Sequence, residues 1–186
     1  MRPHFEGDAE LPAVHLASEH FFDEIVFARL VKGEGLPYPD ITKRGAPPRA
    51  SGRRSVLVEL PTQVFPTHIE HRFFDLGRAG LRPVLAHPER YSPVWKDDTC
   101  LDPLIDAGAF LLLDVCALVG KYGRAAQKAA EKLLDDEAYE AACSDAHRPE
   151  DTDVTEEAIA VLERRVGKEE TERLLGEGPR TILGVR

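Results

Sequence analysis

Residues 55–87 decide the fold, and they read SVLVELPTQVFPTHIEHRFFDLGRAGLRPVLAH. The stretch opens with a continuous apolar run, residues 55–59, and closes with a second one, residues 81–86, and each run leads to a polar residue. Such runs are typical of strands that are buried in a parallel sheet. Because residues 65–80 between them have helical periodicity, the stretch predicts two parallel strands joined by a helix that lies outside the sheet.

The same alternation continues on both sides of this unit. Further strands are predicted at residues 14–18, 110–115 and 140–144, and further helices at residues 21–30, 101–107, 123–134, 155–166 and 169–176. Residues 1–13 lack apolar periodicity, and residues 32–54 form a Gly-, Pro- and Arg-rich loop of a length that often carries function. We therefore predict a single α/β domain over residues 1–186, which agrees with the usual size of one domain.

The composition is that of an acidic globular protein. Of 186 residues, 42% are hydrophobic and 31% are charged, and 24 basic residues against 33 acidic ones leave a net charge of −9. This balance argues against binding of nucleic acid or of an anionic membrane, because both need a broad cationic surface. The most apolar run, residues 107–120, is too short to insert across a bilayer. The N-terminus also lacks a charged-then-apolar signal pattern, so we expect a cytoplasmic protein. The three cysteines are odd in number and form no CxxC pair, so we expect reduced thiols.

Carboxylates and histidines follow the predicted strands. Apolar runs lead to Glu19, to Glu59, to His87 and to the pair Asp145 and His147. Functional groups of parallel α/β folds gather at the carboxyl ends of the strands, so we expect these five residues to meet at one end of the sheet. In an extended chain, residues 145 and 147 project to the same side. Carboxylates and imidazoles without thiolates suit Mn²⁺, Fe or Zn²⁺ better than a structural thiolate zinc site, and they favour a hydrolytic metal centre.

Two other histidines lie three residues apart on a predicted helix. His68 and His71 can share one helical face and so bind a metal ion together. A solvated helical surface beside Glu70 and Arg72 is the simpler interpretation, because polar residues are mostly exposed.

Four segments resemble a known family. The segments are LVELP at residues 57–61, PVLAHPERY at 83–91, SDAHR at 144–148 and LLGEGPRTIL at 174–183. They resemble the manganese-dependent tyrosine phosphatases of bacterial capsule and exopolysaccharide loci, which belong to the polymerase and histidinol phosphatase (PHP) superfamily. The resemblance implies a distorted (β/α)7 barrel that binds up to three metal ions. It also implies removal of phosphate from protein tyrosines, notably on the C-terminal tail of the tyrosine kinase that governs polysaccharide export.

The resemblance assigns roles to residues of this chain. Glu19 resembles the bridging glutamate of the family, and Glu59 and His87 resemble the remaining ligands of one metal ion. Asp145 resembles a ligand of a second ion, and His147 a ligand of the third.

Two arginines complete the expected site. Arg90 resembles the arginine that contacts phosphate, and its planar fork can hold two phosphate oxygens. Arg148 either assists it or forms a surface ion pair.

One part of the family pattern does not occur in this sequence. The family begins with an HxH strand, an acidic residue and a TPH-like segment, and this chain contains no HxH. We therefore expect an N-terminally truncated, incomplete barrel that binds fewer metal ions than the family's three.

The sequence leaves several functions open. The favoured one is metal-dependent hydrolysis of phosphotyrosine on proteins, which would regulate polysaccharide synthesis or export. One alternative is a PHP phosphoesterase for a small phosphate monoester, since substrate choice lies in loops such as residues 32–54. Another is a degenerate, non-catalytic regulator that binds a metal ion or a phosphoprotein. A third is a chain with a late start, whose missing ligands are encoded upstream.

Overall fold

A parallel sheet organises the chain. The computed structural model describes residues 18–34 and 54–184. Within these ranges five strands lie side by side in chain order, and every neighbouring pair is parallel. The strands are β1 (Glu19–Phe21), β2 (Arg54–Glu59), β3 (Leu81–Ala86), β4 (Phe110–Asp114) and β5 (Ala141–Cys143). The predicted parallel α/β architecture is therefore confirmed, and strand order equal to chain order is the arrangement found in (β/α) barrels.

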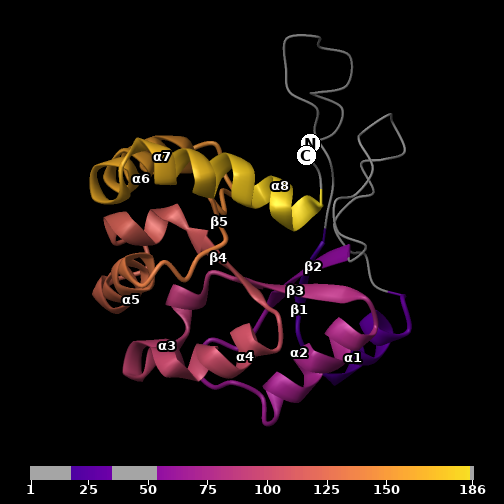
Figure 1. Cartoon of the computed structure of the whole chain (residues 1–186). Coiled ribbons are helices and arrows are strands. Elements are labelled where there is room, and N and C mark those ends of the chain that lie inside the picture. The colour runs from indigo at the N-terminus through magenta and orange to yellow at the C-terminus, as the bar shows by residue number, and fades with distance from the viewer. Residues whose placement is uncertain (1–17, 35–53, 185–186) are drawn as a thin grey trace, which may run out of the picture.

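Helices connect the strands and cover the sheet. They are α1 (Glu24–Val31), α2 (Ile69–Arg78), α3 (Ser92–Lys96), α4 (Asp102–Asp106), α5 (Arg124–Asp135), α6 (Asp151–Val166), α7 (Lys168–Glu172) and α8 (Gly178–Leu183). Short helical turns occupy Pro88–Arg90, Asp98–Leu101, Val115–Val119 and Arg173–Glu177. Helices α1, α2 and α4 lie on one side of the strands and α8 lies on the other (Figure 1). Among the helices of the described ranges, none combines the length and the apolar character needed to cross a membrane.

The central unit matches its prediction except at the start of its helix. Strands β2 and β3 lie where the apolar runs indicate, but α2 begins at Ile69 and not at residue 65. His68 has a φ of 57°, and this left-handed conformation cannot continue a helix backwards. Phe65 instead packs edge-on against Tyr91, with 5.6 Å between the ring centroids. Tertiary packing therefore overrides the helical periodicity before residue 69.

The first strand lies later in the chain than the sequence predicts. Strand β1 begins at Glu19, so Glu19 belongs to the strand and does not follow it. It pairs with Leu57, while Phe21 pairs with Glu59. The reason is packing beyond the strand, because buried Phe22 contacts the rings of α1 and α2 edge-on and places the strand next to these helices. Of the strand predicted at residues 14–18, residues 14–17 lie outside the described residues, as does most of the loop at 32–54.

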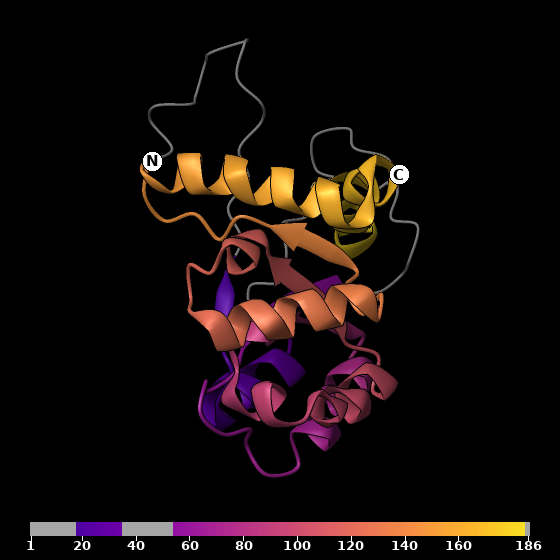
Figure 2. The same cartoon turned by 90° about the vertical axis from the view of Figure 1, so that its left-hand side faces the viewer.

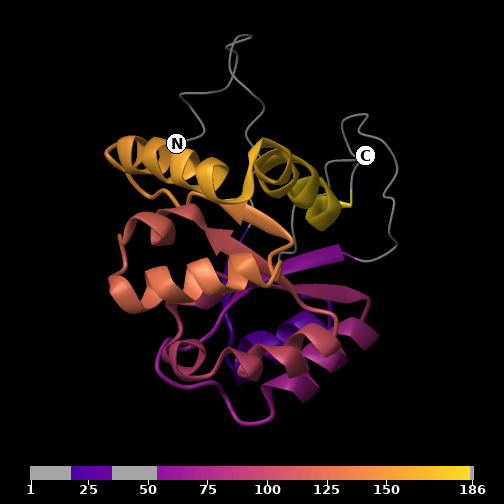
Figure 3. The same cartoon turned by 60° about the vertical axis from the view of Figure 1, so that its left-hand side comes forward.

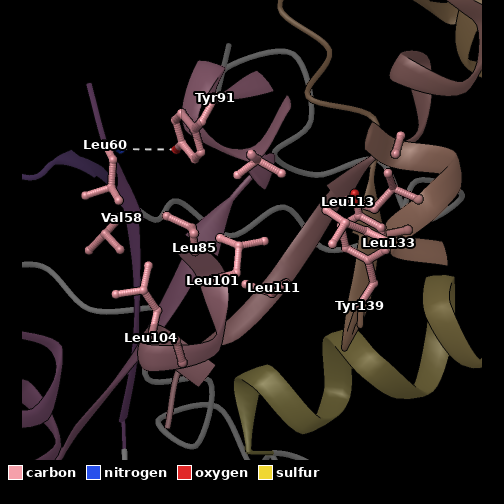
Figure 4. Close-up of a cluster of buried hydrophobic side chains, with 14 of the residues drawn as sticks. Val58, Leu60, Leu85, Tyr91, Leu101, Leu104, Leu111, Leu113, Leu133 and Tyr139 are labelled. Carbon is pink, nitrogen blue, oxygen red and sulfur yellow. Dashed lines mark hydrogen bonds between the residues drawn. The ribbon is translucent and has the colours of Figure 1, made fainter. Parts of the chain in front are cut away.

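Side chains that alternate along the strands form two clusters. The larger one faces the helices and includes Val58, Leu85, Leu111 and Leu113 of the strands together with Leu104 of α4 and Leu133 of α5 (Figure 4). The smaller one lies on the opposite face and joins Val84, Leu112 and Ala141 to Ile182 of α8. Successive side chains of a strand point to opposite faces of the sheet, so alternate residues belong to the two clusters. Both faces of the sheet are buried along β3 and β4, as continuous apolar strands require, whereas β1 keeps exposed side chains.

The C-terminal helices close the second face. The helix predicted at 169–176 is confirmed and continues beyond its expected end. From Glu172 the chain passes through a π-helical turn at Arg173–Glu177 directly into α8, which the periodicity did not predict (Figures 2 and 3). The Ser55 hydroxyl donates a 2.5 Å hydrogen bond to the carbonyl oxygen of Ile182, which fixes α8 against β2. A Cβ at Gly178 would collide with the carbonyl oxygen of Glu140, so only glycine permits this approach.

Candidate metal and phosphate site

His87 lies at the carboxyl end of β3, where three predicted metal ligands meet. Its φ of 35° turns the chain sharply after the strand, and its amide donates to the carbonyl oxygen of Leu112 on β4. The ring is buried, with Nε2 3.4 Å from Oε1 of Glu19 and 3.6 Å from Oε1 of Glu59. Three strands thus bring one imidazole and two carboxylates to one place. Glu59 and His87 lie at the ends of their strands as predicted, whereas Glu19 lies at the beginning of β1.

The charges of this group stabilise one another. Burial lowers the pKa of His87, but the hydrogen bond with Glu19 opposes it and the pKa is raised overall. The same hydrogen bond holds the pKa of Glu19 below its usual value, against the effect of burial. His87 Nδ1 is buried and has no hydrogen-bond partner among the described residues. Two carboxylates facing one imidazole nitrogen form a donor set that fits Mn²⁺, Fe or Zn²⁺.

Arg90 joins this group to a second one around Asp145. Its Nη1 donates a 2.8 Å hydrogen bond to Oδ2 of Asp145, which follows β5, and its guanidinium lies 4.4 Å above the ring centre of Tyr122. Burial lowers the pKa of Arg90, but Tyr122 and Asp145 raise it, and the net shift is upward. The arginine stays charged and is held at the end of the sheet where the predicted ligands lie.

Asp114 belongs to this site, and our sequence reasoning did not identify it. It ends β4 with no exposed surface, and its Oδ1 accepts a hydrogen bond from the amide of Cys116. Its Oδ2 lies 3.9 Å from Nη1 of Arg90. Burial raises the pKa of Asp114, and the Tyr122 hydroxyl and the Cys116 amide oppose the shift. The sequence contains the same signal as for Glu59, since both residues are carboxylates that end an apolar strand. Asp114, however, lies within the most apolar run of the chain.

His147 and Arg148 lie farther out, on the loop after Asp145. The ring of His147 is largely exposed, and its Nδ1 lies 2.8 Å from the carbonyl oxygen and 3.9 Å from Oδ1 of Asp145. The extended conformation expected for residues 145–147 is wrong, because Asp145 has a φ of 43°. The Arg148 side chain is exposed and forms no hydrogen bond or ion pair with the residues that the structure describes. The ion-pair interpretation of Arg148 therefore finds no partner within those ranges.

Asp151 fixes this loop to the neighbouring one. Its Oδ2 accepts hydrogen bonds from the amides of His147 and Arg148, at 2.9 and 3.1 Å. Its Oδ1 accepts a 3.0 Å hydrogen bond from Nζ of Lys121. The amide of His147 and the Lys121 ammonium lower the pKa of Asp151 to about 2, so the carboxylate remains charged.

Alternate residues of the HPERY segment point in opposite directions. Glu89 and Tyr91 are fully buried, whereas Arg90 reaches the site. The Tyr91 hydroxyl accepts from the Leu60 amide and donates to the carbonyl oxygen of Ala86, which ties β2 to β3 (Figure 4). Burial raises the pKa of Glu89 to about 7. Tyr91 therefore serves packing and does not border a substrate pocket.

Another imidazole and carboxylate group lies on the surface. One possible ligand atom each of His68, Glu70 and His71 lies within 4.8 Å of the other two. Among the described residues, no other three histidine, cysteine or acidic side chains bring their ligand atoms this close together. Both histidine side chains are exposed, and their rings stack 5.3 Å apart. Exposed groups of this kind are common on helices without a metal ion, and the interpretation as a solvated surface stands.

Known proteins resemble this chain over most of its length. A family model described as capsular polysaccharide synthesis, CpsB/CapC, matches residues 37–184. The tyrosine-protein phosphatase YwqE of Bacillus subtilis (strain 168) is 31% identical over 115 residues, which make up 61% of this chain and 45% of YwqE. The putative tyrosine-protein phosphatase CapC of Staphylococcus aureus is 31% identical over 94 residues, or 50% of this chain and 37% of CapC.

A solved structure agrees with the fold. It comes from work on YwqE of Bacillus subtilis and CpsB of Streptococcus pneumoniae, described as metal-dependent tyrosine phosphatases, and it superposes with a TM-score of 0.75 at 25% identity. The superposition covers 91% of this chain and 64% of the solved one. The chain spans less than half the length of the two curated relatives. Because the family model matches about four fifths of the residues and the PHP-type fold agrees, the chain belongs to the CpsB/CapC family of capsular polysaccharide synthesis proteins.

Proposed function

We propose that this chain carries a metal-dependent centre that hydrolyses phosphotyrosine on proteins. The observation that carries the proposal is the meeting of Glu19, Glu59 and His87 beside Arg90 and Asp145, at the carboxyl ends of the strands. Relatives described as tyrosine-protein phosphatases, one of them metal-dependent in its solved form, support this reaction class.

We assign the residues as follows. Glu19, Glu59 and His87 would hold one metal ion, with Asp145 and His147 available to further ions. A divalent cation supplies an acidified water and a charge that attracts phosphate oxygens. Mn²⁺ is our first choice, and Fe and Zn²⁺ suit the same donors.

Arg90 would bind the phosphate group itself. Its guanidinium offers two parallel N–H donors, which match two phosphate oxygens and stabilise the charge that develops on them. Its contact with the Tyr122 ring keeps the guanidinium plane in one orientation. Arg148, on the exposed loop, is available to the same phosphate or to the substrate peptide.

The cysteines do not suggest a thiolate nucleophile. All three are free, and burial raises the pKa of Cys100 to about 11 and also raises the pKa of Cys116 and Cys143. Raised pKa values leave little thiolate at neutral pH. Hydrolysis through water is therefore the mechanism that the chain's own side chains support.

The family's role in capsular polysaccharide synthesis points to the biological substrate. We propose a phosphotyrosine protein of that system, such as the C-terminal tail of a bacterial tyrosine kinase. Because tyrosine kinases use ATP, we place the reaction in the cytoplasm.

One experiment tests the function directly. The purified chain is assayed with Mn²⁺ on a phosphotyrosine peptide, beside His87→Ala and the surface control His68→Ala, with bound metal measured in each. We expect His87→Ala to lose both activity and bound metal, while His68→Ala keeps both. Unchanged activity in His87→Ala would contradict the site. Tight peptide binding without turnover in the unaltered chain would favour the non-catalytic regulator instead.

A further inference from the structure

Only one of the two carboxylate oxygens of Asp114 accepts a hydrogen bond. Oδ1 accepts the Cys116 amide, whereas Oδ2 is buried and forms no hydrogen bond of good geometry within the described residues. The Tyr122 hydroxyl lies near this carboxyl group and lowers its pKa, but it does not complete such a bond to Oδ2. The backbone amide of Asp114 donates a 3.0 Å hydrogen bond to Oε1 of Glu89. A buried carboxylate oxygen without a partner is costly, so such an atom calls for an explanation.

Arg90 is the cation that Oδ2 of Asp114 faces. The distance of 3.9 Å to Nη1 is too long for a hydrogen bond, and Nη1 donates instead to Asp145 at 2.8 Å. Tyr122 lies against the guanidinium at 4.4 Å, so the group can slide across the ring from one carboxylate toward the other. A movement of roughly 1 Å would complete the second hydrogen bond, given the usual length of such bonds.

Asp145 has two competing roles. It is the partner of Arg90 in this structure, and it is also a proposed metal ligand. A metal ion bound to Asp145 would repel the guanidinium of Arg90 and compete with it for Oδ2 of Asp145. Arg90 would then need another anion as its partner. Without one it would swing into water and leave the phosphate subsite.

We propose that Asp114 is a positioning residue that receives Arg90 when Asp145 binds a metal ion. This inference rests on the proposed function, because it assumes that Asp145 is a ligand. Asp114 keeps the guanidinium at the sheet end, over Tyr122, with its outer N–H groups directed toward phosphate. Metal binding and phosphate binding are thereby coupled through one arginine.

A double-mutant cycle on metal binding tests this coupling. Mn²⁺ is titrated into the metal-free protein for the unaltered chain, Asp114→Asn, Arg90→Met and the double variant. Asn keeps the acceptor for the Cys116 amide and removes only the charge. We expect Asp114→Asn to weaken Mn²⁺ binding at least about fivefold, the low end of typical coupling between sites. In the Arg90→Met background the same change should have no effect, because no arginine competes for Asp145.

The Arg90→Met background distinguishes an effect of Asp114 through Arg90 from a direct attraction of Asp114 for cations. If Asp114 simply attracts cations, Asp114→Asn weakens Mn²⁺ binding equally in both backgrounds, and the proposal is overturned. A stronger Mn²⁺ affinity in Asp114→Asn would overturn it as well.

A metal-free measurement keeps the inference independent of the function. In a crystal structure of Asp145→Ala, we expect Nη1 of Arg90 within hydrogen-bond distance of Oδ2 of Asp114. A guanidinium that turns to solvent would refute the role of Asp114. If the unaltered chain binds no Mn²⁺ at all, the proposed function fails, and the Asp145→Ala structure still decides whether Asp114 receives Arg90.

Discussion

Nη1 of Arg90 donates a 2.8 Å hydrogen bond to Oδ2 of Asp145, although the two residues lie 55 positions apart in the chain. The bond joins the turn after β3 to the loop after β5, across the end of β4. It places the arginine proposed to bind phosphate directly beside a carboxylate proposed to bind metal.

Arg90→Lys should lower kcat/KM on a phosphotyrosine peptide by about 100-fold, the usual cost of removing one transition-state donor. A lysine keeps the charge but cannot offer two parallel donors to phosphate or lie flat on the Tyr122 ring. Steady-state kinetics with Mn²⁺ measure the effect, and the exposed Arg78→Lys serves as a control that should match the unaltered chain. Equal activity of Arg90→Lys and the unaltered chain would remove Arg90 from the site.

Tyr139→Phe should lower the free energy of unfolding by about 1–3 kcal/mol, the cost of leaving a buried acceptor without its donor. The Tyr139 hydroxyl donates a 3.0 Å hydrogen bond to Oε2 of fully buried Glu89. Urea unfolding measures the change. Glu89→Gln is the matched variant, because its amide can donate to the tyrosine oxygen and still accept the Asp114 amide, so we expect a smaller loss. A larger loss in Glu89→Gln would show that the charge itself is needed.

Gly178→Ala should destabilise the protein by about 1–3 kcal/mol, as overpacking of a close contact does. The added Cβ would collide with the carbonyl oxygen of Glu140 and push α8 away from β5. Gly176→Ala is the control two residues earlier, where the new Cβ meets only the end of the Arg180 side chain at 3.6 Å. Urea unfolding should separate the two variants, and equal stability would mean that α8 does not pack as described.

Glu140→Gln should raise the urea midpoint at pH 7 and lose that advantage near pH 4. Burial raises the pKa of Glu140 above its usual value, against the effects of Arg173 and Arg82. A carboxyl group with a raised pKa in the folded state contributes stability below its unfolded pKa and loses it as pH rises through the folded pKa. Glutamine removes this loss. Unfolding curves of both proteins between pH 4 and 8 give the difference, and an advantage that does not change with pH would contradict the cause.

Local sequence patterns predicted the strands β2 to β5 and most of the residues of the candidate site. Continuous apolar runs fixed β2, β3 and β4 within a residue or so, because burial in a parallel sheet leaves a signal in every consecutive residue. The polar residues that follow them, Glu59 and His87, were identified for the same local reason. The rule that parallel strands end at one edge predicted that Glu59 and His87 meet, whereas Glu19 reaches them from the first position of β1.

Tertiary structure alone decided the rest. Asp114 was hidden in an apolar run, and only the sheet brings it beside Arg90. The start of β1 at Glu19 depends on Phe22 packing against α1 and α2, and the place of α8 depends on the contact at Gly178. These features are contacts between residues far apart in the chain. Local periodicity carries no record of such contacts, because their free energy arises only when the chain has folded.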